Sequence, residues 1–221
     1  MLSATPIPTH PVSRAVESRD LMVLTDIYRD DTNLVCWQAP ALDPDTMNYL
    51  HRLASSTLPP KITTVLSARH CTNQMRDCFP EHPARRTLVA WLAECIDLFA
   101  SLFEQERVGV RLRYLTSAMC PRFHVDNIPV RLVHTLVGPG TEWLTEDNLD
   151  RSRLGRGNGG LPDEHSGLLF EPRNIQRLNA GDVALLKGSG WVGNEHAGLV
   201  HRSPAVTPVA GRWVLTLDLA D

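Results

Sequence analysis

The sequence lacks long apolar runs, a strong net charge and a leader-like N-terminus. No stretch approaches the roughly 18 consecutive apolar residues that a membrane-spanning helix needs, and residues 1–9 have no basic region followed by an apolar stretch. The formal net charge is only -3 over 221 residues, which gives no bulk attraction to nucleic acid or to an anionic membrane. We therefore expect no nucleic-acid partner, no membrane partner and no secretory signal.

Cysteine is present without a pattern. The five cysteines are odd in number and scattered, and none forms a Cys-x-x-Cys motif. We therefore expect neither a disulfide framework nor a structural zinc site. Reduced thiols in the cytoplasm are the simplest interpretation.

The chain is long enough for one sizeable core. We expect one compact domain with three regions: a flexible N-terminal arm over residues 1–19, a helical and mixed support region over 20–106, and a β-rich core over 107–221. In the support region, Asp43 followed by Pro44 predicts a helix start. Apolar residues at helical spacing over 84–106 predict a longer helix that packs on a sheet.

The β-rich region changes to a period of two residues. Over 108–115, Val110, Leu112 and Tyr114 share one face, and Arg111 and Arg113 share the other. Short strand-like runs follow, interrupted by a polar, glycine-rich segment over 145–166 that is typical of a lid. Helices followed by strands indicate an α+β fold, with helices bracing one side of an antiparallel sandwich or barrel.

A His-x-Asp pair, His124 and Asp126, follows the first strand-like run of this β-rich region. Residues two apart on a strand point to the same face, so the imidazole and the carboxylate can meet at one point. These are two of the three ligands of the facial triad that holds non-haem Fe(II). The third is expected to be a later histidine. We favour His201, which follows an apolar lead, over His196, which lies in a loop-like stretch.

In these motifs the β-rich region resembles the Fe(II)/2-oxoglutarate-dependent dioxygenases, and most closely their prolyl-hydroxylase-like branch. The match is in the order and spacing of Tyr114, His124-x-Asp126, His201 and Arg212. The resemblance implies a double-stranded β-helix core (a jelly roll, cupin-like) with the N-terminal helices packed on one sheet. The whole chain is also similar to an uncharacterised bacterial family with the same Arg-Phe-His-x-Asp and Gly-Pro-Gly-Thr-Glu-Trp signatures, which supplies no activity.

The resemblance also implies the roles of individual residues. The triad would hold Fe(II), and Arg212 would bind the far carboxylate of 2-oxoglutarate, which is consumed together with O2. Arg131 is a second candidate for this anchor, and otherwise a surface strand residue. Tyr114 would either hydrogen-bond the co-substrate or be a half-buried aromatic residue of the sheet. The implied activity is hydroxylation of an unknown substrate, which is a small molecule, a peptide or a protein side chain.

A non-catalytic protein that binds zinc or iron in a cupin-like barrel, for metal homeostasis, is the alternative, because imidazole and carboxylate ligands also suit Zn(II). Arg212 discriminates between the two, since a 2-oxoglutarate enzyme needs it and a metal binder does not. A jelly-roll interaction domain with incidental histidines is a third possibility. The oligomeric state is left open.

Overall fold

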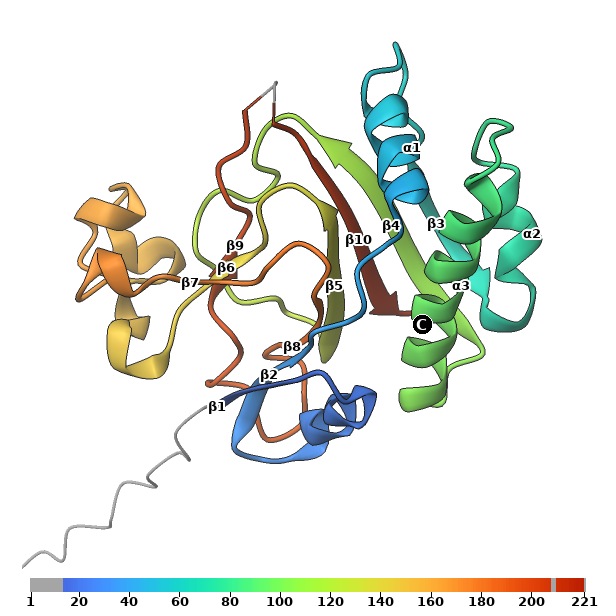
Figure 1. The fold of residues 1–221 in the computed structure, drawn as a ribbon. Coiled ribbons are helices and arrows are strands. Elements are labelled where there is room, and N and C mark those ends of the chain that lie inside the picture. Colours follow the sequence, from blue (N-terminus) through green and yellow to red (C-terminus); the bar gives the residue numbers. More distant parts are fainter. Residues whose placement is uncertain (1–13, 208–209, 221) are drawn as a thin grey trace, which may run out of the picture.

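Two β-sheets and a layer of helices make up the structure, a computed structural model that describes residues 14–207 and 210–220 (Figure 1). The seven-stranded sheet consists, in spatial order, of β1 (Arg14–Ser18), β2 (Thr32–Trp37), β8 (Val183–Lys187), β5 (Val130–Val137), β10 (Arg212–Leu219), β4 (Arg107–Leu115) and β3 (Ile62–Ser67). The three-stranded sheet consists of β7 (Gln176–Arg177), β6 (Glu142–Trp143) and β9 (His201–Arg202). The expected mixture of helices with a β-rich C-terminal half is confirmed.

From β4 onward the chain crosses back and forth between the two sheets. Strands β4, β5, β8 and β10 lie in the large sheet, whereas β6, β7 and β9 lie in the small one. The pairings among these strands are antiparallel. Between β4 and β5, His124 forms an antiparallel bridge with His201 and adds a further row beside β9. This alternation is the one that a jelly roll predicts.

The helices lie on one side of the large sheet (Figure 1). They are α1 (Pro44–Ala54), α2 (Cys71–Arg76) and α3 (Arg85–Leu102). Asp43 caps α1 by accepting a hydrogen bond from the N–H of Thr46 at 3.0 Å, as expected of an N-cap. Leu92 of α3 is buried in one cluster with Leu112 of β4 and Leu215 of β10. Burial of each such side chain stabilises the fold by about 2 kcal/mol, and it fixes which face of the sheet points away from the helices.

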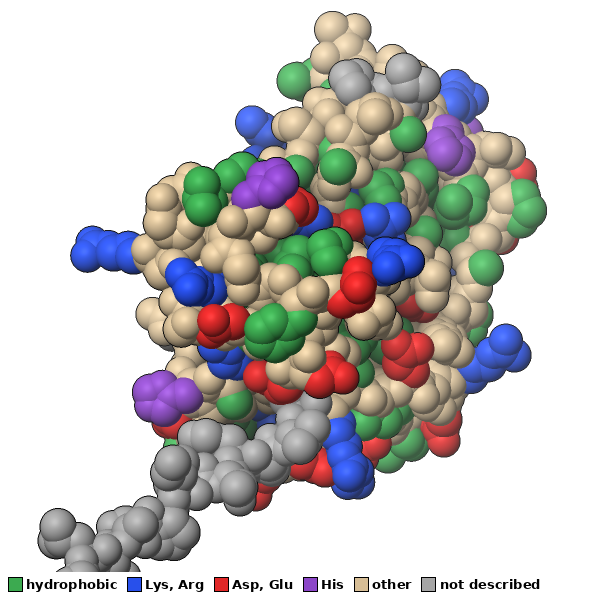
Figure 2. Space-filling model, turned by 90° about the vertical axis from the view of Figure 1, so that its left-hand side faces the viewer, with side chains coloured by type: hydrophobic (Ala, Val, Ile, Leu, Met, Phe, Trp, Pro, Cys, Tyr) green, Lys and Arg blue, Asp and Glu red, His purple; other side chains and the backbone are tan. Residues whose placement is uncertain are grey.

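The segment over residues 145–175 forms a lobe of short turns beside the small sheet (yellow to orange in Figure 1). Its 3-10 turns are η3 (Glu146–Asn148), η4 (Arg151–Arg153), η5 (Gly155–Asn158), η6 (Asp163–His165) and η7 (Pro172–Asn174). Leu149 and Leu168 of the lobe pack with Phe123 and Val200 in a separate cluster. The segment expected to be a lid therefore shares a small packed core with the residues that precede His124 and His201. Figure 2 shows this side of the molecule with acidic, basic and hydrophobic side chains interspersed.

The N-terminal region differs from the expected arm. Arg14–Ser18, expected to be flexible, instead forms β1 and pairs in parallel with β2, because its main chain completes the free edge of that strand. Residues 1–13 of the expected arm lie outside the described residues. The remaining 3-10 turns are η1 (Leu21–Tyr28) and η2 (Ala68–His70). Within the described ranges, every helix is too short or too polar to cross a membrane.

Candidate metal centre

The predicted ligands are positioned by their apolar neighbours. Phe123 and Val200 are buried in the cluster shared with the lobe. Because consecutive residues of an extended chain point to opposite faces, His124 and His201 turn the other way, between the sheets. The N–H of His124 donates to the carbonyl of His201 at 3.0 Å, and the N–H of His201 donates back at 2.9 Å. Two histidines far apart in the sequence are thus held side by side by their main chains.

The structure brings His124, Asp126 and His201 together. Asp126 Oδ1 lies 3.6 Å from His124 Nε2, and Asp126 Oδ2 lies 3.5 Å from His201 Nε2. One ligand atom from each residue lies within 4.8 Å of the other two. Bonds from a metal to such ligands are about 2.0–2.2 Å long, so one ion can reach all three. Two imidazoles and one carboxylate are the donor set of non-haem Fe(II) sites.

The hydrogen bonds of the two imidazoles leave Nε2 of each free to bind a metal ion. Nδ1 of His124 donates to the carbonyl of Arg122 at 2.9 Å, and Nδ1 of His201 donates to the carbonyl of Leu199 at 3.1 Å. A carbonyl only accepts, so each Nδ1 carries the proton and each Nε2 presents a lone pair to the centre. Burial lowers the pKa of His201 to about 4, which keeps it neutral at neutral pH. The nearby carboxylate of Asp126 raises the pKa of His124.

Asp126 is ionised. Burial alone would raise its pKa, but the neighbouring imidazoles of His124 and His201 and the guanidinium of Arg131 outweigh this and lower the pKa to about 2. Arg131 donates from Nη1 to Asp126 Oδ2 at 2.8 Å. The three ligand side chains therefore include one ionised carboxylate, and one of its oxygens is held by a guanidinium.

Arg131 is engaged by two carboxylates. Besides Asp126, it binds Asp218 through Nε at 2.7 Å and Nη2 at 3.1 Å. Asp218 in turn accepts from Arg111 at 2.8 Å. The structure places Arg131 as a partner of the metal ligand, and not as an uncommitted guanidinium on the strand surface or an anchor for a second anion.

Arg212 is a buried guanidinium with no carboxylate partner among the described residues. It is 2% exposed, and it donates to the hydroxyl groups of Thr135 at 2.9 Å and Thr141 at 2.7 Å. Its Nε is buried without a hydrogen-bond partner. Burial lowers its pKa to about 10. A buried, unpaired charge is costly unless an anion joins it, so the residues present fit a ligand carboxylate at this position.

Arg212 lies close to the strand that carries the ligand His201. Thr141, which it contacts, precedes Trp143 by two residues, and Trp143 pairs in register with His201. Two residues of a strand span about 7 Å. A short dicarboxylate is of the size needed to reach from the centre to this guanidinium.

Tyr114 and His196 do not join this arrangement. Tyr114 pairs in register with Trp213, their rings are 5.3 Å apart, and both belong to the cluster on the helical side of the sheet. Arg212, adjacent to Trp213, points to the opposite face. Tyr114 is therefore a half-buried aromatic residue of the sheet in this structure. His196 is an exposed turn residue outside the ligand cluster.

Asp163 supports the centre and was not identified from the sequence. Its buried carboxylate accepts from the N–H of Phe123 at 2.8 Å and forms ion pairs with Arg122 at 2.9 Å and Arg202 at 3.4 Å. These partners flank both histidine ligands. An acidic residue between two glycine-rich turns has no local pattern that distinguishes it, so only the folded lobe identifies it.

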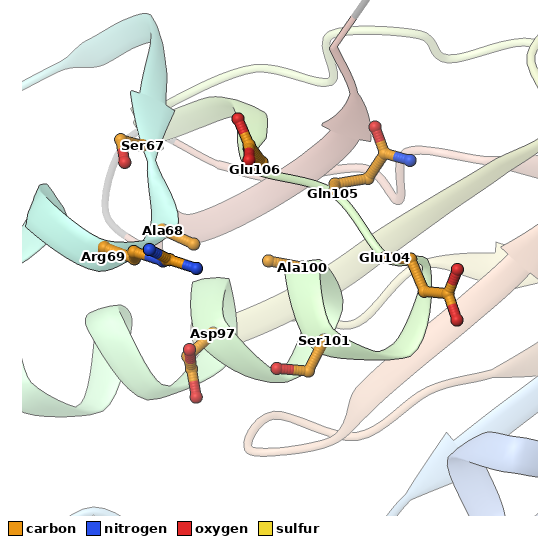
Figure 3. Close-up of a pocket in the computed structure, with 9 residues that line it drawn as sticks. All are labelled: Ser67, Ala68, Arg69, Asp97, Ala100, Ser101, Glu104, Gln105 and Glu106. Atoms are coloured by element: carbon orange, nitrogen blue, oxygen red, sulfur yellow. The ribbon is translucent and has the colours of Figure 1, made fainter.

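A separate hollow of about 360 Å³ lies where the end of α3 meets the beginning of β4 (Figure 3). Carboxylates of Asp97, Glu104 and Glu106 and the guanidinium of Arg69 line it. It contains none of the ligands of the candidate centre.

Comparisons with known proteins give one family and several similar structures. No curated protein matches the sequence significantly. The rice dioxygenase for auxin oxidation has 13% identity and a TM-score of 0.47, with 93% of this chain and 82% of that chain covered. The Arabidopsis thaliana dioxygenase for auxin oxidation 1, in a 2-oxoglutarate complex, has 10% identity and a TM-score of 0.49, with 93% and 91% covered. A full-length Neurospora crassa protein, in complex with α-KG, has 10% identity and a TM-score of 0.45, with 99% and 88% covered.

A family model reaches nearly the full length of the chain. The model described as "Protein of unknown function (DUF1826)" matches residues 18–218. This range includes the three ligands, the lobe and the helical layer. The chain therefore belongs to the DUF1826 family.

Proposed function

We propose that the protein is an Fe(II)- and 2-oxoglutarate-dependent oxygenase of the hydroxylase type, built on a double-stranded β-helix. His124, Asp126 and His201 would hold the iron, and Arg212 would bind the far carboxylate of 2-oxoglutarate. When bound, the iron and 2-oxoglutarate supply the activation of O2, with 2-oxoglutarate converted to succinate and CO2. The protein supplies position, charge and exclusion of water.

The observation that carries the proposal is the pairing of the ligand cluster with Arg212. The cluster alone suits either a catalytic or a storage site for a divalent metal. Arg212 adds a buried positive charge with an unpartnered Nε. A guanidinium forms two parallel hydrogen bonds with a carboxylate, and Arg212 would pair with the co-substrate in this way.

The residues around the centre have separable roles. Arg131 holds Asp126 Oδ2, so that Oδ1 is the oxygen left for the ion and further coordination positions stay open. The Nδ1 hydrogen bonds of His124 and His201 keep their Nε2 atoms aimed at the ion. The lobe covers the back of the small sheet with apolar side chains and keeps water from the outer side of the ligand-bearing strands.

A non-catalytic metal-binding protein is the alternative. Nothing in the ligand set itself excludes Zn(II). Such a protein would gain nothing from Arg212, whose burial without a carboxylate destabilises the fold. Arg212 therefore favours the oxygenase.

The test measures Fe(II) affinity and succinate formation from 2-oxoglutarate in the full-length protein. His124→Ala, Asp126→Ala and His201→Ala should each abolish both, and His196→Ala, the matched control, should change neither. Anaerobic Fe(II) with 2-oxoglutarate should give a weak visible charge-transfer band that Arg212→Ala loses. Unchanged turnover in the triad variants would refute the oxygenase, and metal binding without 2-oxoglutarate binding would favour the alternative.

A further inference from the structure

A second guanidinium on the interior face of the large sheet has an unsatisfied buried nitrogen. In the described part of the chain, Arg113 and Arg212 are the side chains that have a buried nitrogen or oxygen atom without a hydrogen-bond partner, and in both the atom is Nε. Arg113 donates from one terminal nitrogen to the hydroxyl of Thr63 at 3.3 Å. The free Nε–H of Arg113 is therefore available to an acceptor from outside the chain, and the position of Arg113 in the sheet shows where that acceptor would lie.

The register of β4 and β10 places Arg113 on the side of the candidate centre. Arg113 pairs with Val214, and Val214 is buried in the cluster between the two sheets. Arg212 pairs with Leu115, the residue two positions after Arg113. Such diagonal neighbours on adjacent strands lie about 7–8 Å apart. The two unsatisfied guanidinium groups therefore occupy one face, side by side.

The two guanidinium groups differ in access. Arg212 is fully buried, whereas Arg113 is partly exposed and its partner Thr63 is exposed. From β4, Leu115 is the residue that reaches the cluster between the sheets, and it is only partly buried. On the interior face of the sheet, Arg212 is therefore shielded from solvent, whereas solvent reaches the part around Arg113.

The charges around Arg113 leave it without an anion. Arg111, on the same face of β4, is neutralised by Asp218. Asp218 is also bound by Arg131, which binds the ligand Asp126. This row of ion pairs connects the face of β4 with the metal ligand. Among the described residues, no carboxylate forms an ion pair with Arg113, so Arg113 and Arg212 together carry the excess positive charge of this face.

We propose that Arg113 and Thr63 bind an oxyanion group of the substrate, which makes the substrate an anionic compound. The inference rests on the proposed oxygenase function and names its substrate class. The Nε–H and a terminal N–H of Arg113 can pair with two oxygen atoms of a carboxylate, phosphate or sulfate. The hydroxyl of Thr63 accepts from Arg113 and keeps its own proton to donate to the same anion. Arg212, deeper in the site, serves the co-substrate, so each of the two anions has its own guanidinium.

Inorganic phosphate is a suitable probe because it needs no knowledge of the substrate. The experiment measures Tm at constant ionic strength while phosphate replaces chloride, in the metal-free protein and in the protein loaded with Zn(II) and 2-oxoglutarate. Saturation of the site should raise Tm by about 2–4 °C in the wild type. Arg113→Gln should lose this rise, and Arg113→Lys should keep part of it. Sulfate and acetate, tested in parallel, identify the preferred oxyanion.

Arg107→Gln is the matched control, because it removes the same charge from an exposed position on the same strand. Its Tm should rise in phosphate as much as that of the wild type. Phosphate also stabilises proteins in general, but this effect is the same in all variants and cancels when their Tm rises are compared. Equal Tm rises in the wild type and Arg113→Gln would overturn the proposal. A rise that disappears when 2-oxoglutarate is present would also overturn it, because Arg113 would then belong to the co-substrate site. Failure of the oxygenase itself is recognised separately, by absent succinate formation, since the metal-free measurement does not depend on turnover.

Discussion

The carboxylate of Asp163 accepts a 2.8 Å hydrogen bond from the main-chain N–H of Phe123, the residue that precedes the ligand His124. The same carboxylate binds Arg202, the residue that follows the ligand His201. One side chain of the lobe therefore contacts the residues next to both imidazoles, the main chain of Phe123 and the guanidinium of Arg202. This contact ties the lobe to the metal centre without touching the metal position.

Asp163→Ala should weaken metal binding while leaving all three ligands in place. The N–H of Phe123 would lose its buried acceptor, and two guanidinium groups would lose their shared partner. Loss of a residue that orients ligands typically weakens metal affinity by about 10–100-fold. Competition with a chromophoric chelator measures the affinity. Asp150→Ala, in the same lobe but without contact to the ligand segments, should behave like the wild type, and equal affinities of the two variants would contradict the role assigned to Asp163.

Arg131→Gln should change how Asp126 binds a metal ion. Without the guanidinium on Oδ2, both oxygens are free to bind, and a position needed by 2-oxoglutarate is then occupied. We expect the visible spectrum of the Co(II)-loaded protein to change and the affinity for 2-oxoglutarate to fall about 10-fold. Arg111→Gln removes a guanidinium from Asp218 but not from Asp126, so it should keep the wild-type spectrum. A wild-type spectrum and affinity in Arg131→Gln would show that Arg131 is only a structural ion-pair partner.

Arg212→Met should make the ligand-free protein more stable and abolish its response to 2-oxoglutarate. Burial lowers the pKa of Arg212 to about 10, so its charge destabilises the fold by roughly 1–3 kcal/mol until an anion binds. Urea unfolding with and without 2-oxoglutarate gives both quantities. The wild type should gain stability from 2-oxoglutarate, and the variant should not. A variant that is less stable and still responds to 2-oxoglutarate would disprove the assignment of the anchor.

His134 should make stability depend on pH. Its Nε2 accepts from the indole N–H of Trp91 at 2.9 Å, and its Nδ1 donates to the carbonyl of Asp182 at 2.9 Å, so the folded protein holds it neutral. Burial lowers its pKa to about 4, against about 6.5 in the unfolded chain. The unfolded state therefore binds more protons between these values, and the free energy of unfolding should decrease by up to about 3 kcal/mol as the pH falls from 6.5 to 4.

The variant His134→Gln isolates the contribution of His134 to the pH dependence of the unfolding free energy. In the metal-free protein its unfolding free energy should change less between pH 7 and pH 5 than that of the wild type. His51→Gln, at an exposed position on α1, should follow the wild type. Identical pH profiles for the wild type and His134→Gln would show that His134 does not carry the dependence.

The ligand triad could be predicted because its signals are local. His124 and Asp126 lie two apart, and His201 follows an apolar lead that places it on a strand. The helix cap at Asp43 and the strand at Val130–Val137 are predictable for the same reason, since each depends on a few adjacent residues.

The contacts around the triad could not be predicted because they depend on register and on distant partners. The alternation of β4 separates Tyr114 from Arg113, but only the pairing of Tyr114 with Trp213 shows that Tyr114 turns away from Arg212. Arg131 meets Asp218 far along the chain. The parallel strand β1 depends on main-chain pairing with β2, and its five residues have no apolar pattern that indicates it.

The paired main-chain hydrogen bonds between His124 and His201 bear on how folding depends on metal binding. These bonds join the main chains of two ligand residues and involve no cation. Folding would therefore not require bound metal, in contrast to small domains that fold only when zinc binds. The ion could then be lost and regained by an intact molecule. Supply of metal in the surroundings would decide what fraction of molecules is active, while the amount of folded protein stayed the same.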